Sequence, residues 1–407
     1  MSRWYWQDDA CWQANSEAPQ AIAQAWVKDA AHWYARLNER ATEQPLCTDD
    51  PATLQQIVQH AAALRAVSQQ LVVVGTGGAS LGAQAFCALA DAPGCVQFLE
   101  NCDPHTLMRM LRLPKETTSW CIISKSGETV ETLAATLALI AQYDGGLAER
   151  VRVITGPHAS SLRQIAERQG WEIIDHPLTL GGRFSVFSAV GMLPASYAGL
   201  DAPGIVAHAA TDLRNGLAQK DAQLLPHAAW LASHFAEKPM QLLMAYADRL
   251  RPATQWYKQL WAESLGKDGK GGTPVTAIGA IDQHSQLQLY LDGPRDKLLT
   301  VWLPSMDGQS PPLADGGLPG TEYLRGRTMG DVMQATAEAT VMTLRNAAVP
   351  LRVLRGALSP TSLASWMVRQ MLETLLVAEL IGVDPYSQPA VEEGKKLTRT
   401  ALAGNAA

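Results

Sequence analysis

The segment Leu71-Val-Val-Val-Gly-Thr-Gly-Gly78 joins a fully apolar run to a glycine-rich turn, and a helical pattern continues from there to about Ala90. Short apolar runs of the same kind return along the first half of the chain, each followed by a turn signal or a helical pattern. They occupy residues 96–99, 121–123, 151–154 and 171–174. Strands that alternate with helices in this way predict a parallel sheet with helices on both faces.

The same alternation resumes in the second half of the chain, with apolar runs at residues 240–244, 275–278, 298–302 and 351–354. We therefore predict an α/β protein with two domains, each a mainly parallel sheet covered by helices in an αβα sandwich. The predicted domains are residues 51–203 and 239–382, with a helical segment at 1–50, a helical connection at 204–238 and a C-terminal tail at 383–407 that contains a short helix.

Composition narrows the class of protein. The chain has 407 residues, of which 47% are hydrophobic and 18% charged, as expected for a globular protein of two or three domains. Its 33 basic and 39 acidic residues give a net charge of -6 without a long basic cluster, which argues against a nucleic-acid partner. Acidic residues near the N-terminus and the absence of a long apolar run predict a cytoplasmic protein with no membrane partner.

Cysteine and histidine spacing predicts neither a disulfide framework nor a metal site. The six cysteines, at positions 11, 47, 87, 95, 102 and 121, include no C-x-x-C pair. The nine histidines are scattered along the chain. We expect the cysteines to be buried apolar thiols and expect no bound metal.

The segment Ser124-Lys-Ser-Gly-Glu-Thr-Val-Glu-Thr132 follows one of the predicted strands and runs into a predicted helix. Hydroxyls at Ser126, Thr129 and Thr132 recur every three residues, and the N–H groups at a helix start bind anions. The segment predicts a site for a phosphomonoester, although a helix-capping role alone would favour similar residues. We expect Glu128 to face solvent, because a carboxylate turned inward would repel the anion.

Other candidates are weaker when taken singly. The glycine loop at residues 75–82 resembles a dinucleotide-binding turn, but Ser80 stands where the third glycine of that motif belongs. Arg183 follows two glycines at a predicted helix start. Glu263 ends a largely apolar helix, where partial burial would raise its pKa toward that of a useful base. Each is more often a surface residue when it occurs alone, and the same holds for His284 and Lys395.

Taken in order, six segments resemble the phosphoglucose isomerase family, over roughly residues 70–400. They are GTGGASLG (75–82), SKSGETVET (124–132), GGRFSVFSAVG (181–191), WAESLGK (261–267), IDQHSQLQ (281–288) and QPAVEEGKK (388–396). The resemblance implies two sugar-isomerase domains and reversible isomerisation of glucose 6-phosphate to fructose 6-phosphate through an enediolate, in glycolysis and gluconeogenesis. It also implies that no metal or cofactor takes part, and that the protein is a homodimer with shared active sites.

The resemblance also implies roles for individual residues. Glu263 matches the base that moves a proton between the first and second carbons, and Arg183 matches the cation beside the enediolate. His284, contributed by the neighbouring subunit, matches the residue for ring opening, and Lys395 matches a lysine near the ring oxygen. The substrate-binding residues implied are Ser124, Ser126, Thr129 and Thr132 for the phosphate with Lys125 alongside, Gln388 as a polar contact, and Gly77, Gly78 and Gly182 as backbone around the sugar.

The sequence departs from the family at positions that bear on substrate preference. Ala79 stands where the family usually has a serine, although Ser80 follows, and Glu128 replaces a residue that is often hydroxylated. Pro389-Ala390 replaces a pair that is bulkier in many members. A dual phosphoglucose and phosphomannose isomerase is therefore one alternative. The others are a non-catalytic phosphosugar-binding module and a nicotinamide-dependent oxidoreductase that uses the glycine loop.

Overall fold

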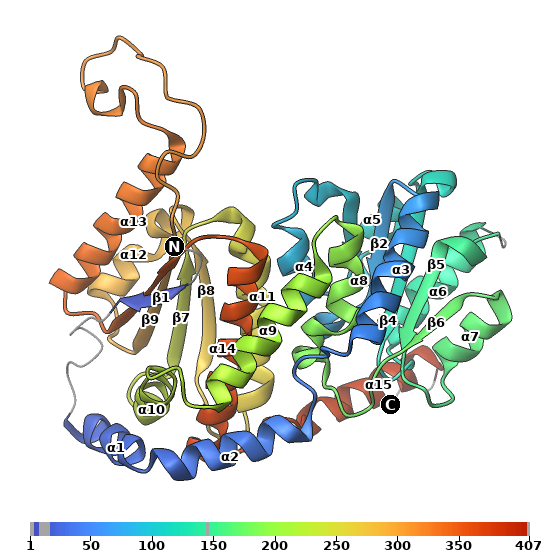
Figure 1. Cartoon of the computed structure of the whole chain (residues 1–407), viewed down its shortest axis with the longest axis horizontal. Helices are drawn as coiled ribbons and strands as arrows, with labels where there is room; N and C mark the ends of the chain where they lie inside the picture. Colours follow the sequence, from blue (N-terminus) through green and yellow to red (C-terminus); the bar gives the residue numbers. More distant parts are fainter. Residues whose placement is uncertain (1–3, 8–16, 144–145, 405–407) are drawn as a thin grey trace.

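A computed structural model of the chain describes residues 4–7, 17–143 and 146–404. It contains two separate five-stranded sheets that lie side by side with helices around them (Figure 1). The first sheet has the order β3-β2-β4-β5-β6, and its strands are all parallel. They are β2 (Gln70–Val74), β3 (Val96–Leu99), β4 (Thr118–Ser124), β5 (Val151–Thr155) and β6 (Glu172–Asp175). The predicted α/β class and the strands of this half are confirmed.

The second sheet has the order β1-β10-β9-β7-β8. Its parallel strands, β7 (Met240–Ala245), β8 (Thr273–Ile278), β9 (Lys297–Pro304) and β10 (Leu351–Gly356), are those predicted. Strand β1 (Tyr5–Gln7) was not predicted: it comes from the N-terminal segment and pairs antiparallel with β10. The guanidinium groups of Arg352 and Arg369 both lie against its Trp6 ring, 4.7 and 4.8 Å from the ring centroid, which fastens this short strand to the sheet.

The helices occupy the intervals that the sequence predicts. Around the first sheet lie α3 (Pro51–Val67), α4 (Leu81–Cys87), α5 (Pro104–Leu111), α6 (Val130–Tyr143), α7 (Ser161–Gln169) and α8 (Ala189–Tyr197). Helices α11 (Arg251–Leu265), α12 (Ile281–Asp292), α13 (Met329–Asn346) and α14 (Pro360–Ile381) accompany the second sheet. The remaining helices are α1 (Glu17–Lys28) and α2 (Ala30–Glu43) at the N-terminus, α9 (Ala202–Leu217) and α10 (Leu224–His234) in the connection, and α15 (Glu392–Leu402) in the tail. The division into two domains stays a prediction.

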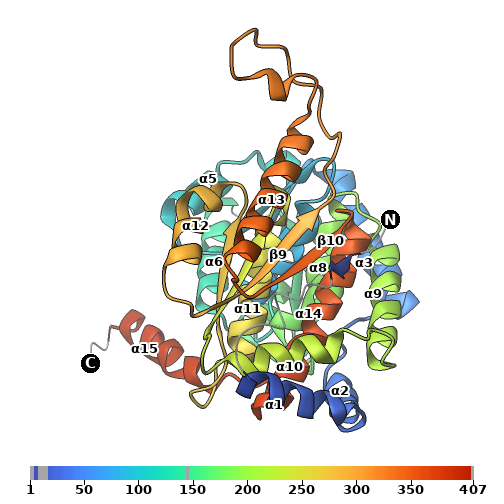
Figure 2. The ribbon, with the colours of Figure 1, turned by 90° about the vertical axis from the view of Figure 1, so that its left-hand side faces the viewer.

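A shared core joins the two sheets. Alternate residues of a strand point to opposite faces, so Leu71 and Val73 of β2 enter a large cluster while Val72 and Val74 enter a separate one on the other face. The large cluster also contains Leu243 and Ala245 of β7. Helices α11 and α14 lie on that inner face of the second sheet, whereas α12 and α13 cover its outer face (Figure 1). The segment between β9 and α13 projects away from the body in both views (Figure 2).

The cysteines agree only in part with the expectation of buried thiols. Cys87 and Cys121 are buried, Cys47 and Cys95 are partly buried, and Cys102 is exposed, so the expectation is wrong for Cys102. Cys11 lies outside the described residues. Among the residues that the structure describes, no helix is long and apolar enough to cross a membrane.

Candidate active site

The loops that follow β2 and β4 meet where the strand order of the first sheet reverses. Ligands of α/β sheets bind at such a point, outside the carboxyl ends of the strands. A cleft of about 550 Å³ opens there. The predicted site residues that line it are Gly78, Ser124, Lys125, Ser126, Thr129, Thr132, Gly182, Arg183, Glu263, Gln388 and Lys395. The structure thus brings residues from five distant segments to one cleft.

One end of the cleft is built from the start of α6 and the turn before it. The Ser124 hydroxyl accepts a hydrogen bond from the N–H of Gly127 at 3.2 Å and lies 3.0 Å from the Thr129 hydroxyl. Gly127 has φ +66°, and a Cβ there would lie 2.1 Å from Ser160 Oγ, so this tight turn needs glycine. Thr132 Oγ1 is buried without a hydrogen-bond partner in the described part of the chain. The several hydroxyls and the N–H groups at the start of α6 make this end suited to a phosphate.

Lys125 adds positive charge to the same end. Burial holds the pKa of its ammonium below the usual range, and the charge of Arg183 lowers it further. Both effects disfavour the protonated form of the lysine. A dianion bound beside it would relieve them, so the site favours an anionic group.

Glu128 does not face solvent, and that expectation is wrong. Its side chain is half-buried, with Oε1 accepting from the N–H of Ser161 at 2.7 Å and Oε2 accepting from the Ser161 hydroxyl at 3.0 Å. A carboxylate is stabilised at a helix N-terminus, and Ser161 begins α7. Glu128 therefore caps a neighbouring helix and is not among the residues that line the cleft.

The other end of the cleft holds an ion pair between a buried arginine and a partly exposed glutamate. The Arg183 side chain is only 3% exposed, and its Nη1 lies 2.9 Å from Glu263 Oε2. Its Nε donates to Ser264 Oγ at 2.9 Å, and Nη1 also donates to Gln388 Oε1 at 3.1 Å. Burial lowers the pKa of Arg183 while Glu263 opposes that shift, and a guanidinium stays protonated in either case. The cation is therefore held rigidly beside the carboxylate.

Gln259 completes the surroundings of Glu263, although it is not among the residues predicted from the sequence. It lies one helical turn earlier on α11, and its Nε2 donates to Glu263 Oε1 at 3.0 Å. Each oxygen of Glu263 thus accepts from a different donor, while the side chain stays 35% exposed toward the cleft. The i,i+4 spacing was the available signal, but many helical pairs share it.

Glycines let the surrounding loops approach one another. A Cβ on Gly78 would lie 2.2 Å from the carbonyl carbon of Gly182, so the two loops meet backbone to backbone. Gly77 has φ +59° and does not line the cleft, but a Cβ there would lie 2.8 Å from Gln259 Nε2. Gly77 therefore leaves room for Gln259 and shapes the site indirectly.

The Ala79 departure has a visible effect. Ala79 lines the cleft, whereas Ser80 does not, because the Ser80 hydroxyl donates to Glu100 Oε2 at 2.9 Å. Ser80 therefore does not replace the missing hydroxyl of position 79. Oε2 of Glu100, the acid that a dinucleotide site would use for a ribose, also accepts from Gln84 Nε2, so this oxygen is engaged by the loop and by the helix α4 that follows it.

Further lining residues carried no signal in the sequence. Gln44, at the end of α2, accepts from the N–H of Gly181 at 2.8 Å through Oε1. His158 Nε2 lies 3.0 Å from the carbonyl oxygen of Ser126. Thr76 and Tyr386 also line the cleft. The N-terminal helical segment, outside both predicted domains, therefore contributes to the site.

His284 and Lys395 differ in placement. Lys395 lines the cleft from the exposed helix α15, where its Nζ lies 2.6 Å from Glu392 Oε1. His284 is exposed on α12 and is not among the residues that line the cleft of its own chain. The single chain therefore assembles every predicted catalytic residue except His284.

The chain is similar in sequence to known proteins. Residues 58–282 match the family model described as phosphoglucose isomerase. A glucose-6-phosphate isomerase of Rubrobacter xylanophilus is 37% identical over 80% of this chain and 81% of its own. A glucose-6-phosphate isomerase of Thermus thermophilus is 35% identical over 88% of this chain and 89% of its own.

Solved structures share the fold. A hypothetical protein from Thermus thermophilus superposes with a TM-score of 0.86 at 31% identity, covering 94% of this chain and 98% of that one. A glucose-6-phosphate isomerase from Chlamydia trachomatis superposes with a TM-score of 0.80 at 18% identity, covering 98% of this chain and 88% of that one. With its family match, its similar relatives and this fold, the chain belongs to the phosphoglucose isomerase family.

Proposed function

We propose that this protein interconverts glucose 6-phosphate and fructose 6-phosphate in the cytoplasm, in glycolysis and gluconeogenesis. The observation that carries the proposal is the Arg183–Glu263 pair, 2.9 Å apart, in the same cleft as the hydroxyl-rich start of α6. One end of the cleft suits a phosphate, and the other suits removal of a proton from carbon. The names of the similar relatives support this assignment.

The reaction moves hydrogen within the sugar, so it needs no external oxidant or reductant. In the proposed mechanism Glu263 takes the proton from the second carbon of the open-chain aldose and returns it to the first carbon. Arg183 stabilises the negative charge that develops on the enediolate oxygen between these steps. The phosphate, bound by Ser124, Ser126, Thr129 and Thr132 with Lys125 alongside, anchors the sugar and orients its reacting carbons.

We further propose that the protein acts as a homodimer and that His284 serves the cleft of the partner chain. This placement is consistent with its exposure on α12, outside the cleft of its own chain. His284 would open the sugar ring together with Lys395, which lines the cleft from α15.

Complementation tests this sharing. Equal amounts of Glu263→Gln and His284→Ala chains, each inactive alone, should recover about a quarter of the wild-type activity after subunit exchange, because half of the dimers are mixed and one of their two sites is intact. Glu263→Gln mixed with Arg183→Ala is the control and should recover nothing, since both residues belong to the cleft of one chain. Verified exchange without recovery in the first mixture would exclude sharing.

A coupled assay with glucose 6-phosphate or fructose 6-phosphate tests the proposed activity. A non-catalytic phosphosugar-binding module would be stabilised against heat by the sugar phosphate without converting it. Mannose 6-phosphate in the same assay tests the dual-specificity alternative. Ala79 lines the cleft without the hydroxyl that the family usually has there, so the discrimination between sugars should be measured.

Lys125 predicts a specific pH dependence. Its lowered pKa means that it loses its positive charge at a lower pH than an exposed lysine does. The phosphate is a dianion above about pH 6, so substrate affinity should fall as the pH rises from neutral through the pKa of Lys125. In Lys125→Arg this fall should disappear, because arginine keeps its charge. KM measured from about pH 7 to about pH 10 checks this, and identical profiles for both proteins would contradict it.

A further inference from the structure

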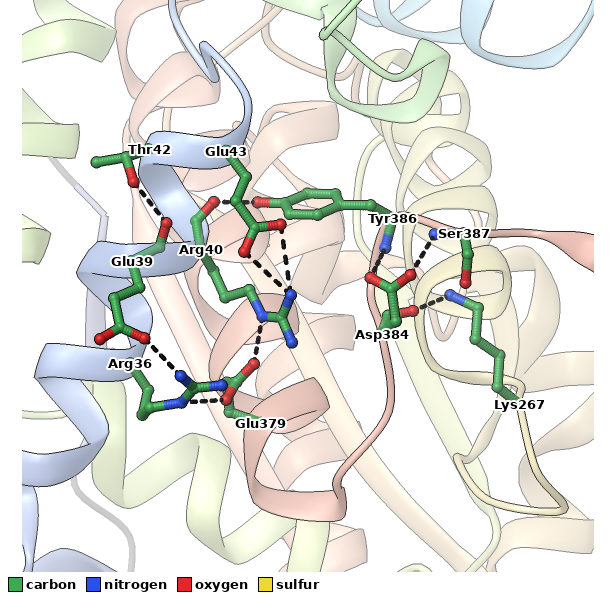
Figure 3. A network of polar contacts seen from close by, with 10 residues as sticks. All are labelled: Arg36, Glu39, Arg40, Thr42, Glu43, Lys267, Glu379, Asp384, Tyr386 and Ser387. Carbon is green, nitrogen blue, oxygen red and sulfur yellow. Dashed lines mark hydrogen bonds and ion pairs between the residues drawn. The ribbon is translucent and has the colours of Figure 1, made fainter.

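Helix α2 is fastened to the end of α14 and to the segment behind it by four side chains: Arg36, Arg40, Glu379 and Tyr386 (Figure 3). We call this group the α2 clamp. We propose that the clamp positions Arg183 for the isomerisation, so that Glu379 and Tyr386 act as positioning residues although they do no chemistry. The inference rests on the proposed function.

Glu379 is the centre of the clamp. Its side chain is only 7% exposed, and its two oxygens accept from Arg36 Nε at 2.9 Å and Arg40 Nε at 2.5 Å. The two arginines are one helical turn apart on α2, so both reach the same carboxylate. Charge-assisted bonds to a buried carboxylate are stronger than surface ion pairs, and loss of one partner leaves a buried charge uncompensated. This contact therefore fixes α2 relative to α14.

Tyr386 extends the clamp toward the cleft. Its hydroxyl donates to the carbonyl oxygen of Arg40 at 2.6 Å. Arg40 lies in the last turn of α2, where carbonyl groups have no partner within the helix. Burial raises the pKa of the Tyr386 phenol, so the hydroxyl keeps its proton and remains a donor. The Tyr386 ring packs edge to face on Phe184, the residue next to Arg183, with centroids 5.4 Å apart.

The segment around Tyr386 is a rigid turn that receives Arg183. Asp384 Oδ1 and Oδ2 accept from the N–H groups of Tyr386 at 3.0 Å and Ser387 at 3.1 Å, and Lys267 Nζ donates to the Asp384 carbonyl (Figure 3). Arg183 Nη2 donates to the carbonyl oxygen of Pro385.

Two of the acceptors of Arg183, Pro385 and Gln388, thus belong to a segment whose place is set by α2. At the phosphate end of the cleft, the Ser124 hydroxyl bonds to the Thr129 hydroxyl and accepts from the N–H of Gly127, and these bonds do not involve the clamp. Loosening the clamp should therefore misplace the guanidinium without weakening phosphate anchoring. It should lower kcat and leave KM nearly unchanged, because a displacement of about 1 Å at a catalytic group costs up to about a hundredfold in rate.

Tyr386→Phe is the decisive variant, because it keeps the ring and removes only the hydroxyl. We expect kcat to fall about tenfold with KM within about twofold of wild type. Tyr143→Phe is the matched control: its phenol also donates to a backbone carbonyl, that of Leu111 at 2.9 Å, at the far end of α6. This control should keep the wild-type kcat. Glu379→Gln should reproduce the kcat loss by releasing α2.

A test of coupling separates positioning from general weakening of the fold. In an Arg183→Lys background the Tyr386→Phe change should cause no further loss of kcat, because the guanidinium that it positions is gone. A wild-type kcat in Tyr386→Phe, or a loss that is fully additive with Arg183→Lys, would overturn the inference. If Glu379→Gln does not fold, Tyr386→Phe still decides. A wild-type chain without isomerase activity would instead overturn the proposed function itself.

Discussion

Replacing Glu263 by glutamine should abolish turnover while leaving sugar-phosphate binding intact. A positioned general base contributes about 10²- to 10⁴-fold, and an amide cannot accept the proton from carbon, so we expect a fall in kcat of about 10³-fold or more. The site should otherwise tolerate the change. The introduced amide oxygen can still accept from Arg183. Its NH₂ group can donate to Gln259 Oε1, which is buried and unpartnered in the described residues, once the Gln259 amide turns over, since Gln259 Nε2 faces that position in the wild type.

The measurement pairs turnover with binding. The coupled assay gives kcat, and calorimetry with a six-carbon phosphorylated inhibitor gives the dissociation constant, which should change little. Glu167→Gln, an exposed glutamate on α7, is the matched control and should keep the wild-type rate. Near-wild-type turnover in Glu263→Gln would remove Glu263 from the role of base.

The second large effect is expected for Arg183→Lys. The guanidinium donates hydrogen bonds to four acceptors at once: Ser264, Glu263, Gln388 and the Pro385 carbonyl. A single ammonium group cannot reach all four. Removal of one preorganised charge contact at a developing oxyanion costs about 10²- to 10³-fold in kcat. KM should change much less, because the phosphate end of the cleft is untouched.

The variant should also be less stable, since buried acceptors lose their donor. Each buried group left unsatisfied costs about 1–3 kcal/mol, which urea denaturation would detect as a lower midpoint. Kinetics and denaturation together separate the two effects, because stability can be restored by bound inhibitor while the chemical rate cannot. Unchanged kcat in folded Arg183→Lys would exclude the arginine from the mechanism.

The fold could be predicted from the sequence because parallel strands are buried on both faces. All seven residues of β4 and all eight of β9 are buried, so such strands stand out as apolar runs between helical patterns. Strand β1 escaped prediction because three residues, Tyr5–Gln7, contain no such run. It is held by a ladder to β10 and by two cations that lie against Trp6, which are contacts to residues more than 340 positions away.

Site residues could be predicted from the sequence only where they lie next to glycine loops or at helix starts, in segments that follow the order of a known family. Arg183 and the hydroxyls of residues 124–132 have such local signals. Gln44 and Gln259 do not, because their roles arise when α2 and α11 are brought to the cleft by packing. The prediction that Glu128 faces solvent was wrong for a related reason. Its partner, the start of α7, is distant in sequence, so no local pattern indicates the contact.

The pairing of β1 with β10 has a consequence for biosynthesis. Residues 70–175 supply every strand of the first sheet, so a nascent chain can close that sheet while the remainder is still being translated. The second sheet has to wait, because Tyr5–Gln7 emerges from the ribosome early and Leu351–Gly356 emerges late. A protein fragment that begins at α9 would lack β1 and would leave the edge of β10 unpaired. Such an edge can pair with another chain and cause aggregation, so the second half of the chain is less suited than the first to be produced alone.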